Sequence, residues 1–294
     1  MPEGICWLVS YPKSGNTWTR ILLSRLRDAC DEETAAALIM ADSQLFSARP
    51  VFDQLTGLDS TELSDAEIDL LRAPAYRQLA AMRRRESAGQ LYIKVHDAFS
   101  RDGNGDPLFP PDVSIGAIYL VRDPRDVAVS YTHHKGHGDF ERTVKGMNSP
   151  TQSLGGYGRP QLRQWTYGWS GHYRSWHEQE AIPVLTVRYE DMLADTAREL
   201  GRMARFLGLP AADDPALLAA AVDASRFDRL QSLETQQGFS ERPEASRSFF
   251  RSGKAGEGRS VLPAALQHEI CDAHGALMAE LGYLPATGLT ETSE

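Results

Sequence analysis

Four side chains of this 294-residue chain stand where short apolar runs end, and their types suit binding an anion and moving a proton. The first, Lys13, lies with Ser14 and Gly15 in a loop between the apolar run 5–9 and a helical pattern that begins at Thr17. A strand, a loop and a helix in that order direct backbone N–H groups and the positive end of the helix dipole at whatever lies above the loop. The loop is therefore predicted to bind a phosphate-like group.

The second and third of these side chains are Lys94 and His96, at the end of the apolar run 91–95. Residues two apart on a strand point to the same side, so both side chains can face one cleft. An imidazole has an ordinary pKa near 6.5, which suits a general base at neutral pH. A structural histidine that caps the strand is the alternative. The pairing with Lys94 favours the catalytic interpretation.

The fourth side chain is Arg122, which ends the apolar run 115–121. Pro124 suits the first turn of a helix, and Ser130 lies about two helical turns beyond the arginine. Ligands of α/β proteins bind at the carboxyl ends of the strands, which favours phosphate binding by Arg122. The alternative is a surface helix whose basic start pairs with Asp123 and Asp126, and for Arg125 that structural interpretation is favoured.

The elements that must position these groups alternate between strands and helices. Apolar runs predict strands over residues 5–9, 91–95, 115–121 and 183–187, each apolar on both faces. Helical periodicity is found over residues 65–85, 124–134, 163–180 and 195–207. This alternation predicts an α/β fold, a single domain over residues 1–294 whose central parallel β-sheet is flanked by helices. Two stretches without clear periodicity, about 135–160 and 236–263, are predicted to be lid or binding loops.

Composition limits the class of protein. With 31 basic and 40 acidic residues the formal charge is −9, which disfavours nucleic acid as a partner, and the 41% hydrophobic content is that of a folded domain. No apolar run approaches the roughly 18 residues of a membrane span, and the start of the chain lacks the layout of a secretory signal. Cys6, Cys30 and Cys271 fit neither a zinc site nor a disulfide framework, so we expect reduced thiols in a cytoplasmic protein.

The loop and the later segments resemble those of the cytosolic-type sulfotransferases, which use 3′-phosphoadenosine 5′-phosphosulfate (PAPS) as donor. Residues 11–18 (YPKSGNTW) are similar to the family's 5′-phosphosulfate loop, and residues 119–131 (YLVRDPRDVAVSY) to its 3′-phosphate motif. Residues 92–97 resemble the Lys-Thr-His segment, 187–192 the Tyr-Glu-Asp segment, and 250–257 the late loop around the 3′-phosphate and adenine. The resemblance runs from about residue 5 to residue 284 and implies a P-loop-like, nucleotide-kinase-like fold.

The resemblance also implies which residues bind the donor. They are Lys13, Ser14, Gly15, Asn16, Thr17, Trp18, Arg122, Ser130, Tyr189, Phe227, Arg251, Ser252 and Gly253. Trp18 and Phe227 would stack on the two faces of adenine, although both have an equally strong interpretation as core aromatics. Asn16, Ser252 and Gly258 stand where the family usually has Thr, Lys and Trp. The family's dimerisation pattern is not reproduced in residues 259–269, so the oligomeric state stays open.

The implied mechanism is an in-line displacement in which His96 deprotonates an acceptor hydroxyl or amine. Lys13 would neutralise the leaving phosphate, and Lys94 would orient or stabilise the sulfonate. No metal is required, and His133, His134 and His137 are interpreted as helix-end or acceptor-loop residues. The product from PAPS would be adenosine 3′,5′-bisphosphate.

Two other functions remain as alternatives. A P-loop nucleotide kinase would share the strand, loop and helix, but it ends its loop in Gly-Lys-Ser or Gly-Lys-Thr, whereas this loop reads Lys-Ser-Gly. A non-catalytic nucleotide-binding protein has no use for a base such as His96.

The resemblance implies a small-molecule, glycan or peptide acceptor, and these three alternatives stay open. Candidate residues for its pocket are Phe99, His133, Tyr157, Trp165, Tyr167 and Trp169. The spacing of Trp165 and Trp169 also predicts one face of a helix, which would place both in the core.

Overall fold

Four parallel strands form the centre of the fold. The computed structural model describes residues 3–28, 46–85, 90–239, 241–242 and 248–285. In the described chain the larger sheet consists of β1 (Ile5–Ser10), β2 (Leu91–Val95), β3 (Ser114–Val121) and β6 (Val184–Arg188). Their spatial order is β2-β1-β3-β6, and every neighbouring pair is parallel. The predicted parallel sheet is confirmed, with strand bounds within one residue of those expected.

Both faces of the sheet are buried, as the uniformly apolar strands predict. Ile5, Trp7 and Val9 of β1 point into one hydrophobic cluster, and Cys6 and Leu8 point into another on the opposite face. All six residues of β1 are inaccessible to solvent. A strand in the middle of a parallel sheet must be covered on both sides, which is why it has no polar alternation.

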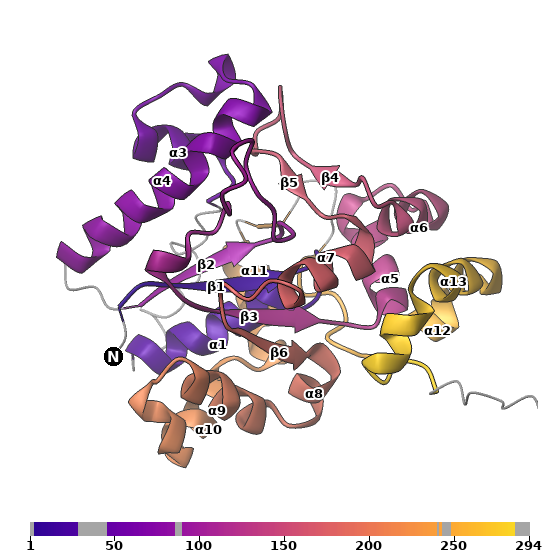
Figure 1. The fold of residues 1–294 in the computed structure, drawn as a ribbon. Coiled ribbons are helices and arrows are strands. Elements are labelled where there is room, and N and C mark those ends of the chain that lie inside the picture. Colours follow the sequence, from indigo (N-terminus) through magenta and orange to yellow (C-terminus); the bar gives the residue numbers. More distant parts are fainter. Residues whose placement is uncertain (1–2, 29–45, 86–89, 240, 243–247, 286–294) are drawn as a thin grey trace, which may run out of the picture.

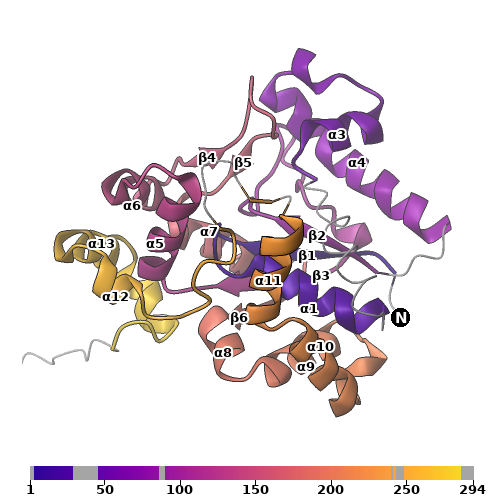
Figure 2. The same cartoon turned by 180° about the vertical axis from the view of Figure 1, so that it is seen from behind.

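Helices cover the two faces. On the face of Trp7 lie α4 (Asp65–Arg85), α7 (Gly168–His177) and α13 (Ala264–Glu280), and on the face of Leu8 lie α1 (Asn16–Asp28), α9 (Thr196–Phe206) and α10 (Pro215–Ala224). Figure 1 shows α7 in front of the sheet, and Figure 2, seen from behind, shows α1 and α11 (Phe227–Gln237) on the near side.

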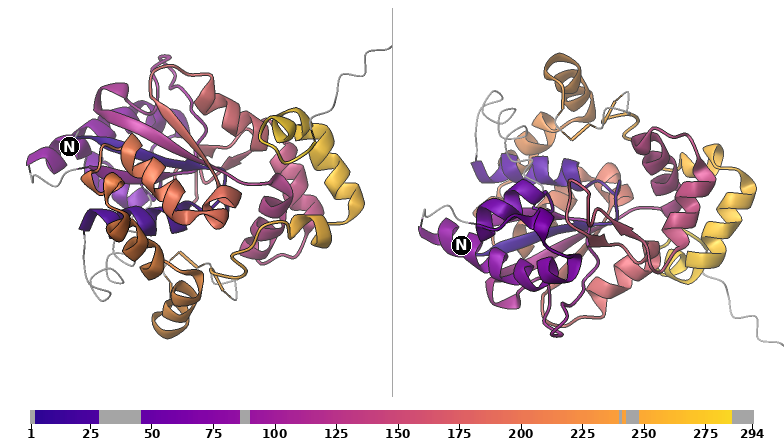
Figure 3. Two further views of the ribbon diagram at one scale, coloured as in Figure 1. Left: turned by 90° about the horizontal axis from the view of Figure 1, so that it is seen from below. Right: turned by 90° about the horizontal axis from the view of Figure 1, so that it is seen from above.

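Four of the helices, α5 (Pro124–Lys135), α6 (Phe140–Asn148), the short α12 (Gly258–Val261) and α13, gather at the end of the molecule remote from the amino terminus (Figure 1). Here α5 packs against α6 and α12, and α13 packs on both α5 and α6. Figure 3 shows this group of helices from below and from above the view of Figure 1. The remaining elements are α3 (Arg49–Thr56), β4 (Ser153–Leu154), β5 (Gln164–Trp165), α8 (Tyr189–Ala194) and the short 3-10 helices Ser60–Glu62, Pro111–Val113 and Pro210–Asp213.

The helix predicted over residues 163–180 is wrong at its start. Gln164 and Trp165 belong to β5, and α7 begins at Gly168. Tyr167 and Gly168 have φ angles of 48° and 71°, in the left-handed region that a right-handed helix cannot continue through. Trp165 and Trp169 therefore do not share a helix face: Trp169 is buried in the core, whereas Trp165 is half-buried on β5.

The segment 135–160, predicted to be an irregular loop, contains regular structure. Gly136 ends α5 with a φ of 69°, and Asp139 caps α6 by accepting a hydrogen bond from Arg142 N at 2.9 Å. Val144 and Met147, three apart on α6, are both fully buried. The cap and this spacing are the signals that the prediction overlooked.

The second predicted loop, 236–263, is irregular in most of its described part. Helix α11 continues into it as far as Gln237, and α12 lies near its end. Residues 240 and 243–247 of this stretch, and Cys30, lie outside the described residues. Cys6 and Cys271 are free thiols, the first buried in the core and the second half-buried. Among the described helices, none is long and apolar enough to cross a bilayer.

Candidate active site

A cavity of about 640 Å³ lies at the carboxyl ends of the four parallel strands. Lys13 follows β1, Lys94 and His96 lie at and just beyond the end of β2, Arg122 follows β3, and Tyr189 follows β6. The cavity brings together residues that the sequence analysis assigned to the site, namely Lys13, Gly15, Asn16, Thr17, Trp18, Lys94, His96, Arg122, Ser130, Tyr189, Phe227, Arg251, Ser252 and Gly253. Ser14, although part of the first loop, is fully buried and does not line the cavity.

The first loop is held in an unusual backbone conformation. Lys13 has a φ of 71° and Gly15 a φ of 101°. A Cβ on Gly15 would lie 2.8 Å from the Tyr189 ring, so only glycine fits this close approach. Asn16, the residue that departs from the family pattern, donates from its side-chain amide to Leu8 O at 2.6 Å and thereby fastens the loop to β1.

Some buried polar atoms of the site have no hydrogen-bond partner within the described part of the chain. They include Ser14 Oγ, Asn16 Oδ1 and Arg122 Nε. Buried donors such as a hydroxyl and a guanidinium N–H are costly to leave unpaired. Arg122 lines the cavity, and a ligand with anionic oxygens bound there would supply the acceptor that its Nε–H lacks, so this residue fits a phosphorylated ligand.

The side chain of Glu241 lies in the cavity among basic groups. Its carboxylate accepts from Lys94 Nζ at 2.8 Å, from Thr17 Oγ1 at 3.0 Å and from Arg20 Nη2 at 2.5 Å. Burial would raise the pKa of Glu241, but Lys94 and Arg20 together lower it to about 2. Burial lowers the pKa of Lys94, and Glu241 opposes that shift.

Sequence reasoning missed both Glu241 and Arg20. Arg20 follows Asn16 by four residues on α1, so helical periodicity signals that it shares a face with the loop. Glu241 lies in a stretch without periodicity, and no local pattern connects it to Lys94, which is 147 residues away in the chain.

His96 is oriented by the backbone of β1. Its Nδ1 lies 2.9 Å from Ser10 O, a contact in which Nδ1–H donates and Nε2 is left as the basic nitrogen. The backbone O of His96 accepts from His172 Nε2 at 3.2 Å, and Tyr119 donates to His172 Nδ1 at 2.7 Å. Burial, and then the charge of Lys94, lowers the pKa of His96 to about 3, so the imidazole is neutral at pH 7.

The amine of Lys13 lies close to an aromatic ring and an imidazole. Its Nζ is 4.2 Å from the centre of the Phe249 ring and 3.4 Å from His134 Nδ1. Burial, followed by the charge of Lys94, lowers the pKa of Lys13 to about 8. The Lys13 side chain is therefore mostly protonated at pH 7, and its lowered pKa lies only slightly above that pH.

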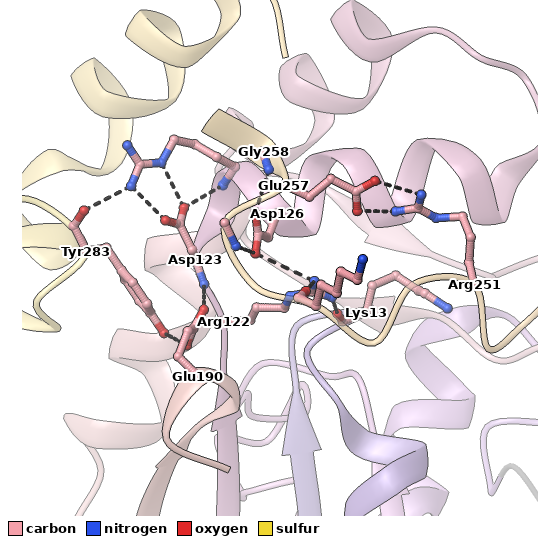
Figure 4. Close-up of polar contacts among 12 residues, drawn as sticks. Lys13, Arg122, Asp123, Asp126, Glu190, Arg251, Glu257, Gly258 and Tyr283 are labelled. Carbon is pink, nitrogen blue, oxygen red and sulfur yellow. Dashed lines mark hydrogen bonds and ion pairs between the residues drawn. The ribbon is translucent and has the colours of Figure 1, made fainter. Parts of the chain in front are cut away.

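Arg122 contacts groups from four parts of the chain, and Figure 4 shows it beside Lys13 and Asp126. Its guanidinium donates to Lys13 O at 3.3 Å and to Lys254 O at 2.8 Å, lies 3.6 Å from Asp126 Oδ2, and stacks 4.4 Å from the centre of the Tyr189 ring. These contacts hold the guanidinium between the first loop and the late loop.

Arg125 does not line the cavity. It forms a two-pronged ion pair with Asp123 at 2.9 and 2.7 Å and also donates to Tyr283 O at 2.9 Å. Asp123 N in turn donates to Glu190 Oε1 (Figure 4). The structural interpretation of Arg125 is supported by this geometry.

The late loop docks on α5 through backbone groups. Asp126 accepts from Gly256 N at 2.8 Å and from Gly258 N at 2.6 Å. A Cβ on Gly258 would lie 2.3 Å from the Arg125 carbonyl carbon, so the tryptophan of the family pattern cannot occupy this position here. Arg251 pairs with Glu257 (Figure 4), and Ser252 and Gly253 line the cavity.

Two aromatic rings, those of Trp18 and Phe227, also line the cavity. Trp18 and Phe227 pack against the same small cluster around Ile21 and Leu230, and Trp18 Nε1 donates to Ser225 O at 3.0 Å. Gly253 has a φ of 62°, and a Cβ there would meet the Phe227 ring at 2.5 Å. The Phe227 ring and the backbone of the late loop are thus in direct contact.

The residues suggested for an acceptor pocket do not line this cavity. Phe99 and Trp169 are core residues and Tyr157 is 74% exposed. His133, Trp165 and Tyr167 are also absent from the lining. The lining includes instead Tyr131, His134, Lys135, Leu154, Gln161 and Gln164. Within the described residues, no group of three or more His, Cys, Asp or Glu side chains is arranged to hold a metal ion.

Comparison with known proteins identifies the class. The sulfotransferase domain family model matches residues 5–282, so the chain belongs to the sulfotransferase domain family. Luciferin sulfotransferase of Photinus pyralis is 27% identical over 210 residues, which are 68% of this chain and 50% of that protein. The match therefore spans half the length of this relative. Flavonol 3-sulfotransferase of Flaveria bidentis is 24% identical over 274 residues, 87% of this chain and 76% of its own.

A solved structure has the same fold. Retinol dehydratase in a complex with retinol and PAP superimposes with a TM-score of 0.64 at 20% identity, covering 95% of this chain and 82% of that one. The predicted family and the predicted sulfotransferase fold are both confirmed.

Proposed function

We propose that this protein transfers a sulfuryl group from PAPS to a hydroxyl or amine of an acceptor. The observation that carries the proposal is the meeting of Lys13, Lys94 and Arg122 with a neutral, oriented His96 in one cavity. Three basic side chains suit a donor with several negative charges, and a neutral imidazole suits the removal of a proton. The PAP bound by retinol dehydratase supports a donor of this type.

The donor site extends from the first loop to the late loop. Backbone N–H groups at the start of α1, with Lys13, Ser14, Gly15, Asn16 and Thr17, would bind the 5′-phosphosulfate. Arg122, Ser130, Arg251, Ser252 and Gly253 would bind the 3′-phosphate, and Tyr189 would contact the adenosine. Adenine would lie between Trp18 and Phe227.

Donor binding requires two rearrangements of side chains. Glu241 pairs with Lys94 and Arg251 pairs with Glu257, so the donor's anions would replace these carboxylates as partners. The late loop itself is already docked on α5 through Asp126.

The reaction proposed is an in-line displacement. The acceptor oxygen forms a bond to sulfur while the bond between sulfur and the bridging oxygen of the 5′-phosphate breaks. The acceptor proton passes to His96 Nε2, and the electron pair of the broken bond leaves with adenosine 3′,5′-bisphosphate. Lys13 would neutralise the charge that develops on the leaving phosphate, and Lys94 would orient the sulfonate.

The part of the cavity proposed to bind the acceptor is lined by both apolar and polar side chains. Leu154 and the ring of Tyr131 are apolar, whereas Gln161, Gln164 and Lys135 offer hydrogen bonds. A small molecule, a glycan or a peptide side chain fits this description, and the acceptor's identity, the oligomeric state and the cytoplasmic location stay predictions.

Calorimetry tests the proposal. Wild-type protein should bind adenosine 3′,5′-bisphosphate tightly without metal, and Arg122→Ala should abolish or greatly weaken that binding. A screen of phenols, alcohols and amines with labelled PAPS should then yield a sulfated product. Preference for ATP with Mg²⁺ over the bisphosphate would instead support the nucleotide kinase alternative. Bisphosphate binding without any transfer in a broad screen would favour a nucleotide-binding protein.

A further inference from the structure

Glu234, on α11, is a buried carboxylate outside the catalytic residues described above, with only 6% of its surface exposed. Its Oε1 accepts from Phe249 N at 2.6 Å, and its Oε2 accepts from Phe250 N at 2.9 Å and from Ser248 Oγ at 3.1 Å. All three donors belong to the segment that immediately precedes Arg251.

The same side of α11 makes two more contacts with this segment. Gln231, three residues before Glu234, donates from Nε2 to Phe250 O at 3.0 Å. Phe227, at the start of the helix, lies under the backbone of Gly253, where no Cβ would fit. One helix therefore carries the proposed adenine platform and also fixes the chain on both sides of Arg251.

The segment depends on these contacts because residues 248–253 belong to no helix or strand. A buried backbone N–H group without a hydrogen-bond acceptor is energetically costly. The Glu234 carboxylate accepts from two successive N–H groups and so replaces the carbonyl acceptors that a neighbouring strand would provide. Hydrogen bonds to a charged acceptor are also stronger than those between neutral groups.

We infer that Glu234 is a positioning residue for the donor: it holds the backbone at Phe249 and Phe250 so that Arg251, Ser252 and Gly253 face the cavity. The inference rests on the proposed function, because it assigns these three residues to the donor's 3′-phosphate and adenine. It assigns Glu234 no contact with the donor.

Glu234→Gln is the informative substitution. Glutamine has the same shape, but its NH₂ group must face one of the two backbone N–H donors, which places donor against donor. Glu67→Gln is a matched control, because Glu67 also accepts from a backbone N–H and a hydroxyl, those of Ser64 at 2.8 and 2.7 Å, but on the exposed start of α4. Gln231→Leu is a milder second variant, which removes one hydrogen bond to the same segment.

Two measurements test the positioning role of Glu234. Calorimetry with adenosine 3′,5′-bisphosphate should give a dissociation constant at least about tenfold higher for Glu234→Gln and unchanged for Glu67→Gln. Hydrogen–deuterium exchange of the peptide containing Phe249 and Phe250 should be faster in Glu234→Gln. If that variant does not fold, Gln231→Leu should show both effects at a smaller size.

The outcomes separate the inference from the proposed function. Bisphosphate affinity equal to that of wild type, or weaker affinity without faster exchange of this peptide, would overturn the positioning role and leave the sulfotransferase proposal intact. Failure of the wild-type protein to bind the bisphosphate would overturn both.

Discussion

Lys94 Nζ and Glu241 Oε2 lie 2.8 Å apart, so the candidate donor site contains a carboxylate of the chain's own. Thr17 and Arg20 donate to the same carboxylate. An anion is therefore stabilised at this end of the cavity by two cations and a hydroxyl. The donor's 5′ end would have to compete with Glu241 for these groups.

The first prediction concerns that competition. Glu241→Gln should bind adenosine 3′,5′-bisphosphate about tenfold more tightly, because the ligand no longer displaces a charged competitor. The ligand-free variant should melt at a lower temperature, because Lys94 and Arg20 lose a buried partner. Calorimetry and thermal melts check the two effects, with Glu178→Gln on the exposed end of α7 as control. Weaker bisphosphate binding by Glu241→Gln would show that Glu241 helps to build the site.

The second prediction concerns the base. His96→Ala should lower turnover by about 10²–10⁴-fold, the usual contribution of a general base, and should leave bisphosphate affinity close to that of wild type. Turnover is measured with labelled PAPS and any acceptor found in the screen. His268→Ala, which removes an exposed histidine of α13, is the control. Full turnover by His96→Ala with normal donor binding would rule out His96 as the base.

The third prediction concerns pH. The pKa of Lys13 in the free protein is lowered to about 8, and a bound anionic ligand favours the protonated amine. Binding therefore takes up a proton above about pH 8, and bisphosphate affinity should fall by up to about tenfold per pH unit as pH rises beyond that value. Calorimetry at about pH 7 and about pH 9.5 measures the change. Lys13→Arg keeps its charge over this range and should give a nearly flat profile, and an equally steep profile in that variant would assign the titration to another group.

The fourth prediction separates two neighbouring arginines. Arg125→Ala should destabilise the fold by about 2 kcal/mol or more, because it leaves the buried Asp123 without its partner. Its bisphosphate affinity should stay within about threefold of wild type, since Arg125 does not line the cavity. Arg122→Ala, by contrast, should abolish or greatly weaken bisphosphate binding, because Arg122 lines the cavity. A large loss of bisphosphate binding in a well-folded Arg125→Ala protein would contradict the structural role.

The sheet and the strand ends could be predicted from sequence because the signals are local. A strand buried on both faces must be apolar throughout, and the runs that end before Lys13, His96 and Arg122 match β1, β2 and β3 within one residue. Parallel strands place their carboxyl ends at one edge. Residues far apart in the chain could therefore be assigned to one site without knowledge of the tertiary structure.

The helix prediction from hydrophobic periodicity failed where the backbone enters the left-handed region of φ. The pattern around Trp165 and Trp169 is helical in spacing, but Tyr167 and Gly168 interrupt it and separate β5 from α7. Of the proposed acceptor-pocket residues, Trp165 and Tyr167 lie at this turn and outside the cavity lining, and Trp165 pairs with Ser153 where β5 meets β4.

The sequence by itself therefore determined the fold class and the common location of Lys13, Lys94, His96 and Arg122 at the strand ends, because each follows from neighbours a few positions apart. Only the tertiary structure decided which carboxylates these basic groups meet. Glu241 reaches Lys94 across 147 residues, and Asp126 reaches Gly258 across 132. Such contacts depend on how irregular segments cross the sheet edge, and those segments have no periodicity from which their course can be predicted.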